Sequence, residues 1–300
     1  MEEENMLKFI DFLISGISLG SVYAIIALGY TMVYGIAKML NFAHGDVIMV
    51  GAYTTYLVSC SMGLNPIIGI LVSVVVCTLL GMLIERVAYK PLRGAASPLA
   101  VLITAIGVSY LLQNLALLFL GANTVSFTSV IPWKGVSLMG GKLNISGITI
   151  VTIAACVVIM VSLTTFINKT KAGQAMLAVS EDKGAAQLMG INVNGTIALT
   201  FAIGSGLAAI AGVLMCSAYP SLSPYTGAMP GIKAFVAAVF GGIGSIPGAM
   251  VGGILLGIIQ MLSTAYISQQ LSDAIVFAVL IVVLLVKPTG IFGKNIQEKV

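Results

Sequence analysis

Polar side chains that could bind a solute or transfer a proton are concentrated in one short stretch, residues 34–47, which reads YGIAKMLNFAHGDV. Within it, Asn41, His44 and Asp46 follow Lys38 and interrupt otherwise apolar sequence. Polar groups at this density do not face lipid. Two interpretations stay open: a water-exposed turn between two spans, or a broken helix beside a cavity, where non-helical backbone survives at membrane depth. Under the second interpretation, Asn41, His44 and Asp46 line a translocation pathway.

Signatures of catalytic and metal-binding sites are missing from the sequence. The patterns HExxH, GxSxG and CxxC do not occur, and one histidine cannot build a His-rich metal centre. The segment 139–142, MGGK, resembles the end of a phosphate-binding loop. However, Val136 and Leu143 replace the glycine and the hydroxyl residue that such a loop requires. We therefore expect a non-catalytic chain that binds no cofactor or metal of its own.

The elements that position these residues are membrane helices. Of the 300 residues, 59% are hydrophobic and only 8% are charged, against about 25% charged in an ordinary soluble domain. A spanning helix needs only about 20 apolar residues. The sequence predicts an all-α integral membrane protein, a polytopic bundle of about eight or nine transmembrane helices in which residues 1–300 form one domain. We expect spans at 12–30, 46–62, 66–84, 97–120, 147–167, 196–217 and 272–286, with one or two further passes within 231–260.

Small residues at four-residue spacing let two helix backbones approach closely, and they predict the packing positions of the bundle. They are Gly16 and Gly20 in the first span, and Gly248, Gly252, Gly253 and Gly257 toward the C-terminus. Inside another span, Gln113 and Asn114 are expected to form hydrogen bonds between helices.

The basic residues predict the topology. The net charge of +4 is small, and nine of the fourteen basic residues fall in three clusters, so they mark the cytoplasmic side of a lipid bilayer and no nucleic-acid partner is expected. Residues 232–243 either cross the membrane or re-enter it. If they cross, nine passes put the acidic N-terminus outside and the basic tail inside. Lys233, near an expected span end, is a further candidate for the translocation pathway.

Residues 173–191, GQAMLAVSEDKGAAQLMGI, form a polar segment with helix-forming and helix-capping residues between two long apolar runs. Its charged residues Glu181, Asp182 and Lys183 are too costly to bury in hydrocarbon. This loop, bounded at 168–195, therefore lies in water, and the lysines around it put it on the cytoplasmic side.

The same loop predicts a short helix over about residues 181–189. The signals are Ser180 as N-cap, Glu181 and Asp182 at the positive end of the dipole, Ala185, Ala186 and Leu188 as helix formers, and Gly190 as left-handed C-cap. Such a helix is too short to be stable alone, so it needs a packing partner. That partner is either the protein's own spans or a peripheral protein with a groove for an apolar helix face. We expect docking of a peripheral protein along the segment from Gly173 to Gly190.

Four segments of the chain carry a specific family resemblance. They are GSVYAIIALGYTMVYGIAKMLNFAHGDVIMVGAY at 20–53, AVSEDKGAAQLMGIN at 178–192, GIKAFVAAVFGGIGSIPGAMVGGILLG at 231–257 and KPTGIFG at 287–293. Together they resemble the permease subunits of branched-chain amino-acid ABC importers of the Liv type, and the resemblance runs nearly end to end.

The resemblance implies a multi-pass subunit of a bacterial or archaeal inner membrane. Its implied partners are a second, homologous permease, two cytoplasmic ATPases that hold ATP and Mg²⁺, and an external substrate-binding protein. In this family the loop corresponding to 173–191 is the coupling loop that presses into the ATPase. One departure concerns Gln174 and Leu177, where family members commonly carry basic residues. Docking through salt bridges at those two positions is therefore not expected.

The leading hypothesis is the permease subunit of an ATP-driven importer of leucine, isoleucine and valine, forming half of the translocation pathway. Because related permeases handle urea and short amides, a permease of the same family for those solutes is the alternative. An autonomous channel or secondary carrier is the third hypothesis. Few charged residues are available inside the spans to couple transport to protons or sodium, which disfavours the carrier.

Overall fold

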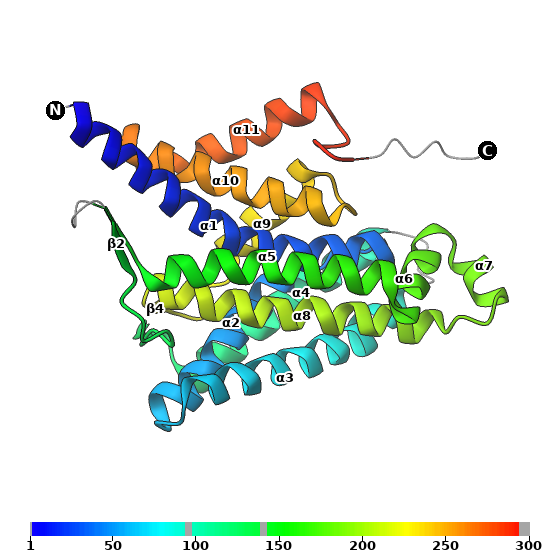
Figure 1. Ribbon diagram of the computed structural model, residues 1–300. Coiled ribbons are helices and arrows are strands. Elements are labelled where there is room, and N and C mark those ends of the chain that lie inside the picture. Colours follow the sequence, from blue (N-terminus) through cyan, green and yellow to red (C-terminus); the bar gives the residue numbers. More distant parts are fainter. Residues whose placement is uncertain (1, 94–97, 139–142, 294–300) are drawn as a thin grey trace.

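The computed structural model describes residues 2–93, 98–138 and 143–293, and in them the chain is a bundle of helices (Figure 1). The helices are α1 (Glu2–Ala37), α2 (His44–Thr55) with its π-helical continuation η1 (Tyr56–Ser61), α3 (Pro66–Ile84) continued by η2 (Glu85–Tyr89) and η3 (Lys90–Leu92), α4 (Pro98–Leu120), α5 (Gly147–Lys169), α6 (Lys171–Glu181), α7 (Lys183–Leu188), α8 (Val193–Ala218), α9 (Ala228–Gly241), α10 (Ile246–Tyr266) and α11 (Ser272–Val286). The strands are β1 (Val125–Ser126), β2 (Val136–Leu138), β3 (Leu143–Ile145) and β4 (Ser221–Leu222), paired β1 with β4 and β2 with β3. Ser97, the expected start of a span, and the MGGK segment at 139–142 lie outside the described residues.

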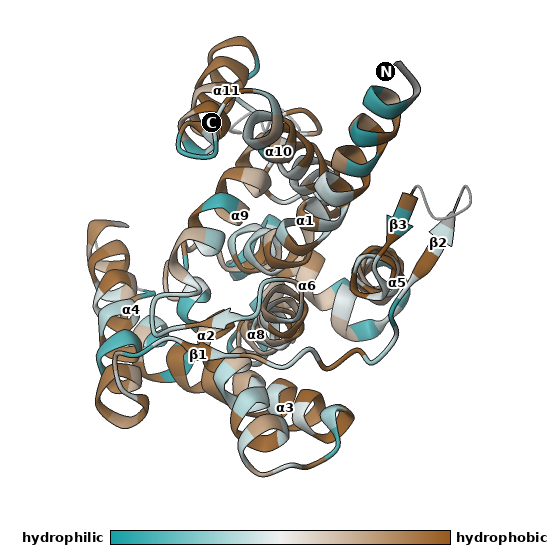
Figure 2. Cartoon of the chain, turned by 90° about the vertical axis from the view of Figure 1, so that its left-hand side faces the viewer, coloured by the Kyte–Doolittle hydropathy of each residue, from teal (hydrophilic) through white to brown (hydrophobic). Residues whose placement is uncertain are grey.

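The predicted helical membrane class is confirmed. Six described helices are long and apolar enough to cross a membrane. They are Glu4–Ala37, Pro66–Leu92, Leu99–Leu120, Gly147–Lys169, Val193–Ala218 and Ile246–Tyr266. The expected count of eight or nine is reached only by adding the shorter α9 and α11 and the broken element α2–η1. Outer helices such as α3, α4 and α11 carry apolar residues on their exposed faces, among them Leu71, Ile103 and Leu285 (Figure 2).

Helix starts are set by side-chain caps that the sequence supplies. Asn65 accepts a hydrogen bond from the Ile67 N–H at 2.9 Å and is followed by Pro66 at the first position of α3. A proline there loses no hydrogen bond, because the first N–H groups of a helix have no intrahelical acceptor. This cap lies in the turn between the two spans expected at 46–62 and 66–84. Ser146, Asn192 and Ser245 cap α5, α8 and α10 in the same way.

The long helix α1 packs closely against α10 because glycines occupy the contact. A Cβ atom added at Gly20 would lie 2.6 Å from the Ile254 Cα, and one added at Gly257 would lie 2.2 Å from the Gly20 Cα. Gly16 faces Ile258, and Gly253 faces Ala24, along the same seam. Gly248 and Gly252 of α10 lie instead against α9, where they face Gly241 and Ala237. The spaced glycines of α10 thus lie in two contacts. Gly253 and Gly257 pack against α1, and Gly248 and Gly252 pack against α9.

Between α1 and α2 the chain is broken inside the bundle. Lys38 adopts a positive φ of 58°, and residues 38–43, here called the break, are not helical. The His44 ring that starts α2 lies 4.6 Å from the Tyr30 ring, centroid to centroid. Tyr30 precedes the end of α1 by seven residues, about 10 Å of helix rise. The break therefore runs back along α1, and α2 begins within the thickness of the bundle, which favours the broken-helix interpretation over the exposed turn.

A second partial helix meets the first near this point. α9 begins at Ala228, and a Cβ atom added at Gly227 would lie 1.8 Å from the Gly45 carbonyl oxygen. Its 14 residues rise only about 21 Å, less than the roughly 30 Å hydrocarbon core. Residues 219–227 supply the remaining length from the end of the bundle where β4 pairs with β1. This path agrees with the nine-pass alternative: the N-terminus and the end of α11 lie at opposite ends of the bundle (Figure 1).

Candidate coupling and translocation site

The loop between α5 and α8 forms two short helices, α6 and α7, which protrude at one end of the bundle (Figure 1). Thr170 caps α6 by accepting a hydrogen bond from the Gly173 N–H at 3.0 Å. Asp182 caps α7 through Oδ1, which accepts from the Gly184 N–H at 2.7 Å and the Ala185 N–H at 3.0 Å. Each helix is thus started by its own side-chain cap.

The predicted cap at Ser180 is wrong. Ser180 lies in the last turn of α6 and donates its hydroxyl hydrogen to the Leu177 carbonyl at 2.7 Å, and Glu181 is the last residue of that helix. Serine and aspartate are nearly equal N-caps, so the order Ser-Glu-Asp does not by itself select one. Asp182 is selected because its extended backbone, with φ −152° and ψ 114°, separates the two helices. The C-cap glycine is found where it was predicted: Gly190 has φ 83°.

The two helices of the loop differ in what they pack against. In α6, Gly173, Met176 and Val179 are buried, and a Cβ atom added at Gly173 would lie 2.4 Å from the Ile167 Cα. In contrast, Leu188 is 89% exposed and Met189 is 82% exposed at the end of α7. Each interpretation of the loop therefore fits one of its helices. α6 packs on the protein's own spans, and α7 exposes an apolar tip that a peripheral protein could bind.

Lys183 connects α7 to the break. Its Nζ donates a hydrogen bond of 2.9 Å to the Ala37 carbonyl, the last residue of α1. Burial, together with the charges of Arg93 and Lys38, lowers the pKa of the Lys183 ammonium. Lys183, the first residue of α7, is thus hydrogen-bonded to Ala37, the residue directly before the break.

Tyr89 of η2 contacts the break at Leu40 and Asn41. Its hydroxyl oxygen lies 3.0 Å from Asn41 Oδ1 and 3.3 Å from the Leu40 carbonyl oxygen, so its single proton can be donated to either. Sequence reasoning missed Tyr89, although it is the only aromatic residue of the charged stretch 85–93. Next to it, Arg93 pairs with Glu85 and donates to the Asn194 side chain at the start of α8.

The polar residues predicted to line a pathway are buried in two separate groups. Asn41, His44 and Asp46 lie together around the start of α2 and are 3%, 1% and 2% exposed. Asp46 Oδ1 accepts a hydrogen bond of 2.8 Å from Gln113 Nε2 of α4, as expected of an inter-helix partner. Asn114 instead donates to the Tyr110 carbonyl of its own helix. His44 Nε2 has no hydrogen-bond partner among the described residues.

Lys233 lies apart from the group around His44. Its Nζ is 2.6 Å from Asp273 Oδ1, so the ion pair joins α9 to the start of α11. Gln260 of α10 donates to the same carboxylate at 3.5 Å and accepts a 2.8 Å hydrogen bond from the Tyr23 hydroxyl of α1. The structure does not bring Lys233 together with Asn41, His44 and Asp46. It makes Lys233 part of a polar network between four helices.

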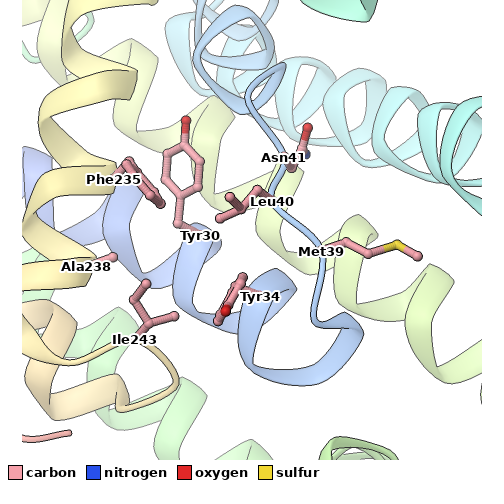
Figure 3. Close-up of a pocket in the computed structure, with 8 residues that line it drawn as sticks. All are labelled: Tyr30, Tyr34, Met39, Leu40, Asn41, Phe235, Ala238 and Ile243. Carbon is pink, nitrogen blue, oxygen red and sulfur yellow. The ribbon is translucent and has the colours of Figure 1, made fainter. Parts of the chain in front are cut away.

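A small pocket lies between α1, the break and α9 (Figure 3). Its empty space, which includes open solvent at the mouth of the pocket, is about 220 Å³. Its lining residues are Tyr30, Tyr34, Met39, Leu40, Asn41, Phe235, Ala238 and Ile243. Three of the eight, Met39, Leu40 and Asn41, belong to the break. One wall of the pocket is therefore the break. Tyr89 is hydrogen-bonded to the break, and Lys183 is hydrogen-bonded to Ala37 directly before it.

The comparisons with known proteins agree with this architecture. Residues 12–284 match the family described as branched-chain amino acid transport system / permease component. The chain is 45% identical to the high-affinity branched-chain amino acid transport system permease protein LivH of Escherichia coli (strain K12), with 99% of each chain covered. It is 43% identical to the corresponding permease protein BraD of Pseudomonas aeruginosa, with 97% of this chain and 98% of BraD covered.

Among solved structures, the chain is similar to a chain of PsaBC from Streptococcus pneumoniae in complex with Fab, with a TM-score of 0.51. That match covers 95% of this chain and 97% of the other at 16% sequence identity, so it supports the fold alone. The family match and the two permease relatives extend over nearly the whole chain. The chain is a multi-pass membrane protein that belongs to the family of permease components of branched-chain amino acid transport systems.

Proposed function

We propose that this chain is the permease subunit of an ATP-driven importer of branched-chain amino acids in the inner membrane. It forms half of the translocation pathway, and its partners are a second permease, two cytoplasmic ATPases and an external binding protein. The relatives at 43–45% identity are named as permeases of high-affinity branched-chain amino acid transport systems, which supports the substrate class. Catalysis of ATP hydrolysis belongs to the ATPase subunits, with their own ATP and Mg²⁺.

The family match carries the assignment as a permease, and the hydrogen bond from Lys183 Nζ to the Ala37 carbonyl carries the proposed route of coupling. α7 presents Leu188 and Met189 for docking into an apolar groove of the ATPase, in the manner of a helix-in-groove complex. A displacement of α7 by the ATPase pulls on Lys183, and Lys183 acts directly on the end of α1. The break follows that residue in the chain. ATP-driven motion thereby reaches the bundle interior through one side chain.

The docking surface of this chain is apolar at its tip and carries no basic residue at positions 174 and 177. Gln174 instead donates a hydrogen bond to the Asn168 carbonyl at 2.7 Å, and Leu177 is 40% exposed. We expect the ATPase to contact the loop through hydrophobic packing around Leu188 and Met189. Docking is accordingly expected to persist in high salt, because apolar burial is not screened as exposed ion pairs are.

The test is uptake of radiolabelled leucine into liposomes that contain this chain with its second permease and ATPase. The proposal predicts that uptake requires ATP and the binding protein together. Uptake by this chain alone would instead identify an autonomous channel or carrier. A thermal-shift screen of the binding protein against leucine, isoleucine, valine, urea and short amides tests the substrate class. Stabilisation by urea or amides only would replace the proposed substrate with those solutes.

A further inference from the structure

The segment at the end of α3 turns different side chains inward and outward. It is π-helical from Glu85 to Tyr89, and these two residues, four apart in the chain, are both buried. Arg86 and Lys90, also four apart, are both exposed. Residues at this spacing lie on the same side of a helical segment. The segment therefore carries two cations on its outer side and Tyr89 on its inner side.

The two outward cations have no carboxylate beside them. Glu85 is the only acidic residue of the stretch 85–93, and it pairs with Arg93 on the inner side. In the part of the chain that the structure describes, neither Arg86 nor Lys90 forms an ion pair. The outer side of this segment therefore attracts an anion from another molecule.

A row of exposed aliphatic side chains on α3 leads to these cations. Its members recur every four residues and are 56–61% exposed: Leu71, Val75, Leu79 and Leu83. The row rises about 18 Å, and one half of the roughly 30 Å hydrocarbon core is about 15 Å deep. α3 itself rises about 28 Å over its 19 residues, so Arg86, two residues beyond it, lies at the edge of the core. This row, here called the α3 row, thus has the length of an acyl chain and ends at the level of the lipid headgroups.

The end of α5 shows that exposed cations alone do not make this pattern. Lys169 and Lys171 are exposed at the end of the bundle where α6 and α7 protrude (Figure 1). Over residues 162–168, which lead to them, the exposed side chains are those of Ser162, Thr165 and Asn168. Hydroxyl and amide groups do not favour contact with an acyl chain. Only the end of α3 therefore combines an aliphatic row with unpaired cations.

We propose that Arg86 and Lys90 bind the headgroup phosphate of an anionic phospholipid whose acyl chain lies along the α3 row. A guanidinium can donate two hydrogen bonds to one phosphate, and an ammonium adds a point charge. Both side chains are long enough to reach the headgroups from the end of a helix. This lipid site goes beyond the proposed function, because it involves neither the transported amino acid nor ATP.

The bound lipid acts on the break through the inner side of the same segment. Tyr89 lies between the two cations in the chain, and its hydroxyl is hydrogen-bonded to the Leu40 carbonyl or to Asn41 Oδ1. A phosphate that holds Arg86 and Lys90 restricts the segment, and with it the position of Tyr89. The lipid therefore stabilises the break without touching it.

The first test measures lipid affinity by native mass spectrometry of the assembled transporter, titrated with phosphatidylglycerol. The double variant Arg86→Gln with Lys90→Gln is expected to bind this lipid roughly 25-fold more weakly, because one cation near the headgroups contributes about fivefold. The matched control, Lys169→Gln with Lys171→Gln, removes the same charge at the same end of the bundle and is expected to bind as the wild type does. The same affinity in the two double variants would overturn the proposal.

The second test uses the wild-type chain and does not depend on how a variant folds. Phosphatidylglycerol and phosphatidylcholine that carry the same photoreactive acyl chain are crosslinked to the transporter in nanodiscs, and the labelled peptides are mapped. Phosphatidylglycerol is expected to label residues 71–87 several-fold more than phosphatidylcholine does, and to label α5 equally. Equal labelling of residues 71–87 by the two lipids would overturn the proposal.

Two further measurements decide what the cations bind. Inorganic phosphate is expected not to displace phosphatidylglycerol, and displacement at millimolar concentration would replace the lipid with a soluble anion. The double variant Arg86→Gln with Lys90→Gln is expected to retain its ATPase in detergent without phosphatidylglycerol. Loss of the ATPase there would assign the two cations to the ATPase contact and overturn the lipid site.

Amide hydrogen exchange tests the effect on the break. Phosphatidylglycerol is expected to slow exchange at residues 38–43 in the wild type but not in Tyr89→Phe, which keeps both lipid-binding cations. Slowing of the same size in Tyr89→Phe would overturn the route through Tyr89. None of these measurements requires transport, so they can fail while the proposed function holds, and the reverse is equally possible.

Discussion

The loop α6–α7 and the break carry their polar side chains in opposite settings. In the loop, Glu181 and Asp182 are exposed to solvent and Leu188 projects outward. At the break and the start of α2, Asn41, His44 and Asp46 are buried. A surface helix can be recognised by another protein, whereas buried polar groups act through the helices that they join. Lys183 joins the two regions through its hydrogen bond to the Ala37 carbonyl. The difference between the two regions points to a division of labour between docking and transmission.

The largest expected effect lies at the buried region. Gly45→Val puts a side chain where a Cβ atom would already be 2.7 Å from the Gly227 carbonyl oxygen. Separating α2 from α9 is expected to cost about 3 kcal/mol, which corresponds to a fall of roughly 5 °C or more in melting temperature. Gly107→Val on α4 is the control, because nothing lies within 4 Å of a Cβ atom there. Equal melting temperatures for the two variants would show that the contact between the partial helices is not tight.

The next effect lies at the exposed region. Asp182→Arg removes the cap of α7, worth about 1 kcal/mol, and Gly190→Pro cannot adopt the required φ of 83°. Both variants are expected to insert normally while ATP hydrolysis becomes uncoupled and leucine uptake falls at least tenfold. Ser180→Ala is the control, since its hydroxyl bonds within its own helix. Normal leucine uptake in both loop variants would show that α7 does not dock on the ATPase.

The buried polar residues should affect transport more than they affect expression. The triple variant of Asn41, His44 and Asp46 to alanine is expected to reach the membrane in normal amount and to lose several-fold in uptake. Loss of the Asp46 carboxylate removes its hydrogen bond from Gln113, and loss of the Asn41 side chain leaves the Tyr89 hydroxyl only the Leu40 carbonyl as acceptor. Uptake per molecule of inserted protein is the measurement. If it equals that of the wild type, these three residues are ordinary parts of the fold.

The smallest effect is expected at the second contact of the break. Tyr89→Phe removes one hydroxyl that is bonded to Asn41 or Leu40, a change of about 1 kcal/mol. Uptake should fall about two- to fivefold, with ATP hydrolysis unchanged. Tyr110→Phe, on the exposed face of α4, is the matched control. A larger loss in Tyr110→Phe than in Tyr89→Phe would show that the hydroxyl at 89 has no special role.

Features with a local cause were predictable from the sequence. The hairpin turn at Asn65-Pro66 and the left-handed Gly190 follow from the chemistry of single residues, and the spans follow from apolar runs. Features that depend on distant contacts were not. The choice of Asp182 over Ser180 as cap depends on how α6 packs on the bundle, and the pairing of Lys233 with Asp273 depends on the course of α9.

The break shows the same limit. The sequence concentrated Lys38, Asn41, His44 and Asp46 in one stretch, and it left open whether that stretch is exposed or buried. The burial comes from Tyr89, Gln113 and the start of α9, which are 48 residues or more from their partners in the chain. No local pattern records such contacts.

Amide hydrogen exchange can show whether Lys183 links the docking helix α7 to the break. Exchange at residues 38–43 is compared in the assembled transporter between wild type, Lys183→Met, Lys183→Arg and Ser180→Ala. We expect faster exchange at 38–43 in Lys183→Met, at least partial restoration in Lys183→Arg, and no change in Ser180→Ala. Equal exchange in wild type and Lys183→Met would contradict this link, because the break would then be held without the bond to Ala37.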